Sequence, residues 1–177
     1  MAEIVPQQPG RLLVGAAQVG DGAEVAHVQV LAGARGSGAE QAFVRALTSP
    51  DDGFAAVLAI PPPTSLAAPR TVLFNKLAIR DARQAAQVFG PAQRAVAQAV
   101  ADCVRNGTIG QADAANLFIC VGVFIHGLAR DEARIWRFNH LATRAALRRA
   151  VFGWPSAGQT IAPEAEIDPA GPPFAAA

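Results

Sequence analysis

The chain has 177 residues, a net charge of +1 and a composition that is 51% hydrophobic. This length suits one domain with a sizeable core, and we expect a single domain over residues 1–177. The even mixture of charges lacks the basic footprint of a nucleic-acid-binding protein. The longest apolar run is too short to span a membrane, and residues 1–10 lack the features of an export signal. We therefore expect a cytoplasmic protein without nucleic-acid or membrane partners.

The first predicted elements are two strands that form a hairpin. Residues 11–18 suit a strand, and the glycine-containing turn after it leads to residues 24–32, where apolar and polar side chains alternate. Side chains two apart in a strand point to the same face. The alternation therefore places four side chains on one face of the second strand: Val25, His27, Gln29 and Leu31.

A helix and two further strands are predicted next. Ser37 precedes Glu40 by three residues, as in a capping box, which predicts a helix that extends to about residue 48. Residues 53–60 form a short apolar strand that is closed by three prolines. Residues 70–79 suit another strand, in which one face carries Phe74, Lys76 and Ala78.

The second half of the chain predicts two long helical regions around one strand. Asp81 can cap a helical region that Gly107 ends, and Gly90-Pro91 must break or kink this region because proline lacks a backbone donor. Residues 117–126 are rich in β-branched and aromatic side chains and predict a buried central strand. The segment that begins at Asp131 starts with acids and ends with arginines, as the helix dipole favours.

The predicted order of elements is β-β-α-β-β-α-β-α, followed by a proline-rich tail over residues 153–177. Strands and helices neither alternate strictly nor separate into two blocks. This order favours an α+β fold, an α/β sandwich with a mixed sheet and helices mainly on one face.

Several common kinds of site are not indicated by the sequence. No phosphate loop is present, and the glycines after the second strand lack the spacing of a dinucleotide fingerprint. The three histidines lack the spacing of a metal site, so we expect neither a metal nor a nucleotide. Cys103 and Cys120 have no partners at metal-ligand spacing, and we interpret both as ordinary core cysteines of a reducing compartment.

His27 and Lys76 are the two side chains that could carry chemistry. Each is the only ionisable residue in the interior of its predicted strand, and Lys76 is the one lysine among 15 basic residues. A hydrogen-bonded structural histidine and a solvated lysine are the alternative interpretations, and the residues alone leave them open. For His126, at a strand end, and His140, within a helix, we favour a structural role.

Four segments together resemble the formaldehyde-activating enzyme family. These segments are VGDGAEVAH, GARGSGAEQAF, the long run FNKLAIRDARQAAQVFGPAQ, and VGVFIH with the helix that follows it. The resemblance extends from about residue 11 to the last residue. It needs no gap between His27 and Gln93.

The resemblance implies a fold like the second domain of ribosomal protein S5 and a homopentamer with the site between subunits. The family's reaction condenses formaldehyde with tetrahydromethanopterin, giving the methylene adduct and water without a metal or a nucleotide. His27 falls on the family's proton donor. A protonated imidazole suits this role because its pKa is close to the working pH. By the same register, three residues fall on pterin-contacting positions: Leu58, Lys76 and Gln93.

The sequence departs from the family pattern at three positions. Gln29 replaces an aspartate, Ala78 replaces a threonine, and Gly127 stands where the family often has tryptophan. The loss of a carboxylate near His27 removes a charge that favours the protonated imidazole. The main hypothesis is therefore a divergent enzyme of this family with an altered pterin site. Two alternatives remain open: a non-catalytic pterin- or aldehyde-binding regulator, and an enzyme that forms an imine between Lys76 and another aldehyde.

Overall fold

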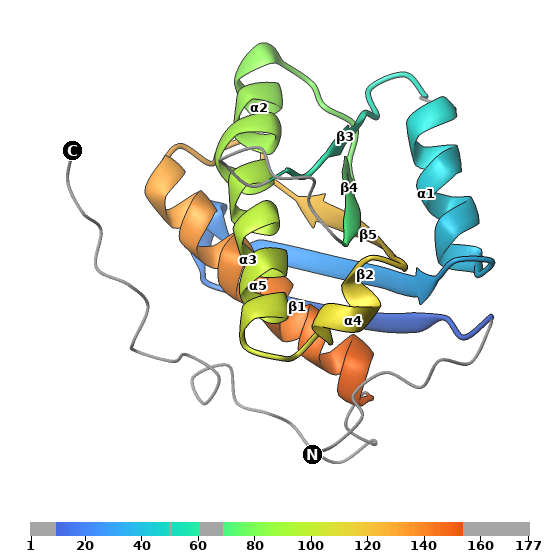
Figure 1. The fold of residues 1–177 in the computed structure, drawn as a ribbon. Helices are drawn as coiled ribbons and strands as arrows, with labels where there is room; N and C mark the ends of the chain where they lie inside the picture. Colours follow the sequence, from blue (N-terminus) through green and yellow to red (C-terminus); the bar gives the residue numbers. More distant parts are fainter. Residues whose placement is uncertain (1–9, 50, 61–68, 154–177) are drawn as a thin grey trace.

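The computed structural model describes residues 10–49, 51–60 and 69–153 (Figure 1). A five-stranded mixed sheet forms its centre, with the strand order β1-β2-β5-β4-β3. β4 and β5 are parallel, and the other neighbouring pairs are antiparallel. The strands are β1 (Leu13–Val19), β2 (Ala26–Ala34), β3 (Ala56–Leu58), β4 (Arg70–Asn75) and β5 (Leu117–Phe124).

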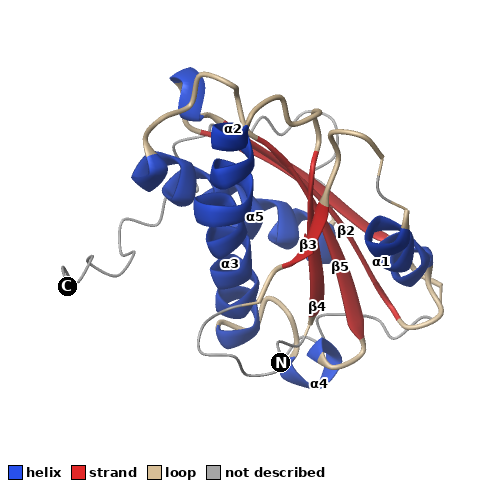
Figure 2. Cartoon of the chain, turned by 90° about the horizontal axis from the view of Figure 1, so that it is seen from above, coloured by secondary structure: helices blue, strands red, loops and turns tan. Residues whose placement is uncertain are grey.

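Helices lie on both faces of this sheet, but unequally. The helices are α1 (Gly38–Thr48), α2 (Ala82–Gln87), α3 (Gln93–Arg105), α4 (Gln111–Ala114) and α5 (Glu132–Phe152), with a 3₁₀ turn, η1 (Gly22–Glu24), and a π-helical turn, η2 (Val88–Ala92). Figure 2 shows α3 and α5 together on one side of the edge-on sheet and α1 on the other. The predicted α+β sandwich with a mixed sheet is therefore confirmed.

The larger core lies between the sheet and the pair α3–α5. Val28 and Val30 of β2 point into it, because alternate residues of the strand face the same side. α5 approaches β1 closely at Gly15, where a Cβ atom would lie 2.0 Å from the Ala146 carbonyl oxygen. Alanines on α5 permit this contact, because their small side chains let the helix and strand backbones come together.

The smaller core lies on the opposite face, under α1. Phe43 of α1 packs edge-to-face on Phe118 of β5, with ring centroids 5.3 Å apart. α1 covers only one end of this face, where β5 begins. The other end of the same face, where β5 ends, carries partly exposed side chains. We call this second region the open face: it comprises His27, Gln29, Phe74, Lys76, Gly122 and Phe124.

The predicted strand over residues 70–79 is too long, because β4 ends at Asn75. The Asn75 side chain accepts a hydrogen bond from the Ala55 backbone and donates to the Gly53 and Leu77 carbonyl oxygens, which turns the chain away from the sheet. The predicted shared face of Lys76 and Ala78 is therefore wrong. Likewise, the expected strand over residues 53–60 is limited to β3.

The predicted capping box at Ser37 does not form, although α1 begins where it was expected. The Ser37 hydroxyl is buried without a hydrogen-bond partner in the described part of the chain, and Glu40 accepts a hydrogen bond from the Gly36 backbone. The predicted cap at Asp81 does form, since its carboxylate accepts a backbone hydrogen bond from the first turn of α2. Asp131, where the last helix was expected to begin, caps α5 in the same way.

The helical region stays helical through Gly90-Pro91 instead of breaking. The π-helical turn η2 accommodates Pro91, whose missing N–H cannot take part in a regular helical ladder. α4 was not predicted from the sequence. No helix in the described ranges is long and apolar enough to cross a membrane. Most of the predicted tail over residues 153–177 lies outside the described residues.

Candidate active site

The structure places His27 and Lys76 in one row across three neighbouring strands. His27 of β2 pairs with Phe124 of β5. Asn75 of β4 pairs with Val123, and the Lys76 backbone N–H donates to the Val123 carbonyl oxygen at 2.8 Å. Lys76 is therefore beside Phe124 on the far side from His27. The row His27–Phe124–Lys76 crosses the open face.

A second row lies next to the first and contains Gln29. Gln29 of β2 pairs with Gly122 of β5, and Gly122 pairs with Phe74 of β4. A Cβ atom on Gly122 would lie 3.2 Å from Lys76 Cγ, so the lysine stem lies over this glycine. Gln29 is exposed, on the same face as His27, as predicted.

The electrostatics of the open face disfavour charge on both basic groups. Partial burial lowers the pKa of His27, and the nearby Lys76 ammonium lowers it further. Partial burial also lowers the pKa of Lys76. Within residues 10–49, 51–60 and 69–153, Lys76 forms no ion pair with a carboxylate. The described part of this site therefore has two basic groups and no acidic partner for either.

Leu58 and Gln93 form a separate pair at the edge of the sheet. Gln93 Nε2 donates a hydrogen bond to the Leu58 carbonyl oxygen at 2.7 Å, which joins the start of α3 to β3. Leu58 is 43% exposed. It pairs with Val72, four residues before Lys76 along β4, which corresponds to about 13 Å. The predicted site residues thus form two groups in one chain.

Ala78 does not join either group. It is exposed in the loop after β4 and lies against Gly53, whose carbonyl oxygen accepts a hydrogen bond from the Ile79 backbone. The expectation that residue 78 lies on the same strand face as Lys76 fails because Asn75 ends the strand.

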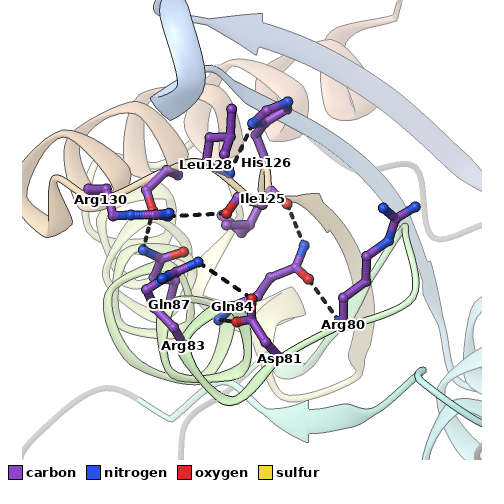
Figure 3. A network of polar contacts seen from close by, with 11 residues as sticks. Arg80, Asp81, Arg83, Gln84, Gln87, Ile125, His126, Leu128 and Arg130 are labelled. Carbon is purple, nitrogen blue, oxygen red and sulfur yellow. Dashed lines mark hydrogen bonds and ion pairs between the residues drawn. The ribbon is translucent and has the colours of Figure 1, made fainter.

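A network of glutamine side chains holds the loop that carries Lys76 (Figure 3). Gln84 of α2 accepts a hydrogen bond from the Arg80 backbone and donates to the Ile125 carbonyl oxygen, both at 2.9 Å. Gln87 donates to the Ala129 carbonyl oxygen at 2.5 Å. Gln84 therefore joins the loop after β4 to the residue that follows β5, and Gln87 joins α2 to the loop after β5.

His126 and His140 differ from His27 in their surroundings. His140 is buried between α3 and α5, with Nε2 2.7 Å from an Asp102 carboxylate oxygen and its ring stacked on Trp136. Its predicted structural role is confirmed. His126 is exposed just after β5, and its Nδ1 accepts a hydrogen bond from the Leu128 backbone.

Sequence reasoning missed three residues of the open face: Phe74 as a site residue, Gly122 and Phe124. β5 is apolar over its whole length, so its pattern does not reveal which residues share a face with His27. The register that pairs β5 with β2 was needed to identify them. A groove of about 450 Å³ under α1 borders the same region, and Phe74 lines it together with Arg45 and Asp51.

The family model and the relatives that match this chain agree with one another. The family model of formaldehyde-activating enzyme matches residues 14–169. A 5,6,7,8-tetrahydromethanopterin hydro-lyase from Methanosarcina barkeri is 40% identical over 163 residues, which cover 92% of this chain and 90% of that protein. The bifunctional enzyme Fae/Hps of Methanothrix thermoacetophila is 41% identical over 149 residues, which cover 84% of this chain but only 38% of that longer protein.

Proposed function

Because the chain belongs to the formaldehyde-activating enzyme family, we propose that it is a hydro-lyase that condenses formaldehyde with tetrahydromethanopterin to the methylene adduct and water. His27 is the general acid in this proposal. The observation that carries it is the row His27–Phe124–Lys76, in which the two candidate groups lie on one partly exposed face.

The chemistry requires a proton at one step. A pterin amine attacks formaldehyde, and a proton transfer gives a carbinolamine. Its C–O bond then breaks, and the hydroxyl takes the His27 proton and leaves as water. The second pterin amine attacks the resulting iminium carbon and loses its proton, which closes the ring and can restore the imidazolium. General-acid help of this kind contributes about 10²–10⁴-fold.

The environment of His27 sets the conditions for this step. Burial and the Lys76 ammonium both lower its pKa, so the imidazolium is a strong acid but is sparsely populated at neutral pH. A carboxylate two residues along the strand would oppose this effect. Gln29 stands there instead and cannot balance the imidazolium charge.

The pterin in this proposal contacts Lys76, Leu58 and Gln93. Leu58 and Gln93 lie at the sheet edge, about 13 Å along the strand direction from the Lys76 row. A site between subunits of a homopentamer, as the resemblance implies, would let two chains contribute to one cleft. Val14 on β1 and Leu58 on β3, the two edge strands of the sheet, are exposed apolar side chains that support such an interface. A solution mass five times that of the chain would test it.

Other features of the proposal follow from the same family. We assign the chain to a single domain with the fold of the second domain of ribosomal protein S5, a cytoplasmic location, and a reaction without a metal or a nucleotide. Cys103 and Cys120 are free thiols in the structure, as a reducing compartment would keep them.

The test is methylene-adduct formation by the purified full-length chain, measured above the spontaneous reaction of formaldehyde with tetrahydromethanopterin. His27→Gln is the matched variant, because it keeps a polar side chain of similar reach without a proton that can be transferred near neutral pH. Equal rates for the two proteins would reject catalysis by His27. A rate equal to the spontaneous reaction for both would reject the enzyme.

A second candidate function is a non-catalytic pterin- or aldehyde-binding regulator. Gln29, in the place of a carboxylate beside His27, is the observation that favours it. Calorimetric binding of tetrahydromethanopterin without turnover would support this alternative. Turnover that depends on His27 would remove it.

A further inference from the structure

Gly122 occupies the centre of the open face, at the junction of the two rows. It pairs with Gln29 on one side and with Phe74 on the other. Its backbone φ lies outside the left-handed region, so no turn requires a glycine here. The side chains that pack over residue 122 instead account for a glycine at this position.

Two side chains lie directly over Gly122. A Cβ atom on this residue would lie 3.0 Å from two ring carbons of Phe74 and 3.2 Å from Lys76 Cγ. These distances are shorter than ordinary van der Waals contacts between carbons, which are about 3.5–4.0 Å. A side chain at residue 122 would therefore have to displace the Phe74 ring, the Lys76 stem, or both.

The path of Lys76 explains why this space matters. Phe124 stands between His27 and Lys76 in their own row, so a phenylalanine side chain occupies the centre of that row. The adjacent row has no side chain at its centre. The lysine stem uses that gap, and from there its ammonium acts on the His27 imidazole.

We propose that Gly122 is a positioning residue for Lys76: its missing side chain lets the lysine stem lie flat on β5 and brings the ammonium beside His27. The expected effect on catalysis rests on the proposed function, whereas the placement of the Lys76 side chain does not. A side chain at residue 122 lifts the ammonium off the sheet and away from both His27 and the pterin that Lys76 contacts.

The other titratable groups near His27 remain in place when residue 122 changes. Glu24 in η1 is held by the Arg130 and Asp131 backbone and by Arg134, and β1 carries no titratable side chain. Other charged or titratable groups around this face are Glu40 and Arg45 of α1, Asp51 after α1, Arg70 of β4, Cys120 of β5 and His126 after β5. None of them lies over Gly122 among its nearest atoms.

The test measures the pKa of His27 by NMR titration of the histidine ring in the full-length protein. We expect Gly122→Val to raise this pKa toward the value found in Lys76→Met, because the positive charge moves away. In a Lys76→Met background the same Gly122→Val change should leave the His27 pKa unaltered. A folded Gly122→Val protein with the wild-type His27 pKa would overturn the proposal.

Activity supplies a second readout. Displacement of Lys76 by about 1 Å should lower kcat/KM between about tenfold and a hundredfold in Gly122→Val, with a smaller loss in Gly122→Ala. If the Gly122→Val protein does not fold, Gly122→Ala takes its place in both measurements. Gly38→Ala is the matched control, because its Cβ would meet only Leu12 at an ordinary 3.9 Å.

The two hypotheses fail in different ways. If the wild-type chain has no turnover, the proposed function fails, but the titration still reports whether Gly122 positions Lys76. If turnover depends on His27 and all variants share one His27 pKa, the proposed function stands and the role of Gly122 is rejected.

Discussion

The open face around His27 and the interface between α3 and α5 around His140 each hold an imidazole whose pKa is lowered mainly by burial. Their partners differ. Asp102 holds His140 through a 2.7 Å contact and opposes the effect of burial, whereas the Lys76 ammonium adds to the effect of burial at His27. Burial alone therefore does not separate a structural histidine from a reactive one. The charge of the neighbour and access to solvent separate them.

The largest effect should come from removal of the His27 imidazole. We expect His27→Ala to lower the rate of methylene-adduct formation by about 10²–10⁴-fold, the usual contribution of a general acid. The unfolding midpoint should change little, because His27 is partly exposed and forms no ion pair with a carboxylate in the described ranges. Steady-state kinetics and thermal unfolding of the same preparation check both points. A folded His27→Ala protein with the wild-type rate would contradict this assignment.

Removal of the Asp102 carboxylate should lower stability and leave activity unchanged, the reverse of what is expected for His27→Ala. Asp102→Ala leaves His140 without its partner at the α3–α5 interface, and loss of a hydrogen bond to a charged group costs about 2 kcal/mol. This corresponds to about a thirtyfold change in the unfolding equilibrium constant, while kcat/KM should stay unchanged. Urea unfolding measures the first quantity.

Asp102→Asn is the control for the previous change, since an amide keeps a hydrogen-bond acceptor toward His140. It should lose less stability than Asp102→Ala. Equal losses would show that the charge of Asp102, and not the hydrogen bond, stabilises this interface.

The pH dependence should separate activity from stability. Above the lowered pKa of His27, the protonated fraction and hence the rate should rise about tenfold for each pH unit of acidification. Stability should fall over the same range. Unfolded histidines titrate near 6.5, so below that pH the unfolded chain binds more protons than the folded chain at both His27 and His140. Rate–pH profiles test the predicted rise in rate, and unfolding measurements at pH 5.5–8 test the predicted fall in stability.

The smallest effect should come from restoring a carboxylate on the open face. Gln29→Asp places a negative charge on the same face as His27, which raises the pKa of the imidazole and should increase the rate at neutral pH several-fold. Gln111→Asp is the matched control, since Gln111 is exposed on α4, just before the start of β5, whereas His27 pairs with the end of that strand. A lower rate in Gln29→Asp would show that the amide itself contributes to pterin binding.

Most of the fold could be predicted because most of the strands and helices have their own local signal. The alternation around His27 predicted the hairpin and the shared face of His27 and Gln29, and both are present. Asp81 and Asp131 predicted two helix starts, since a carboxylate that accepts first-turn N–H groups acts locally. The extent of β4 could not be predicted, because the Asn75 side chain ends it through contacts with residues 20 and 22 positions away.

The sequence by itself determined the family, the two groups with unusual chemistry and the order of the elements. These are properties of residue type and spacing along the chain. Only the tertiary structure decided which groups meet. It set His27 beside Phe124, brought Lys76 over Gly122, and moved Leu58 and Gln93 to another part of the sheet. The physical reason is strand register: β4 and β5 are separated by more than 40 residues, and only their pairing determines which of their side chains become neighbours.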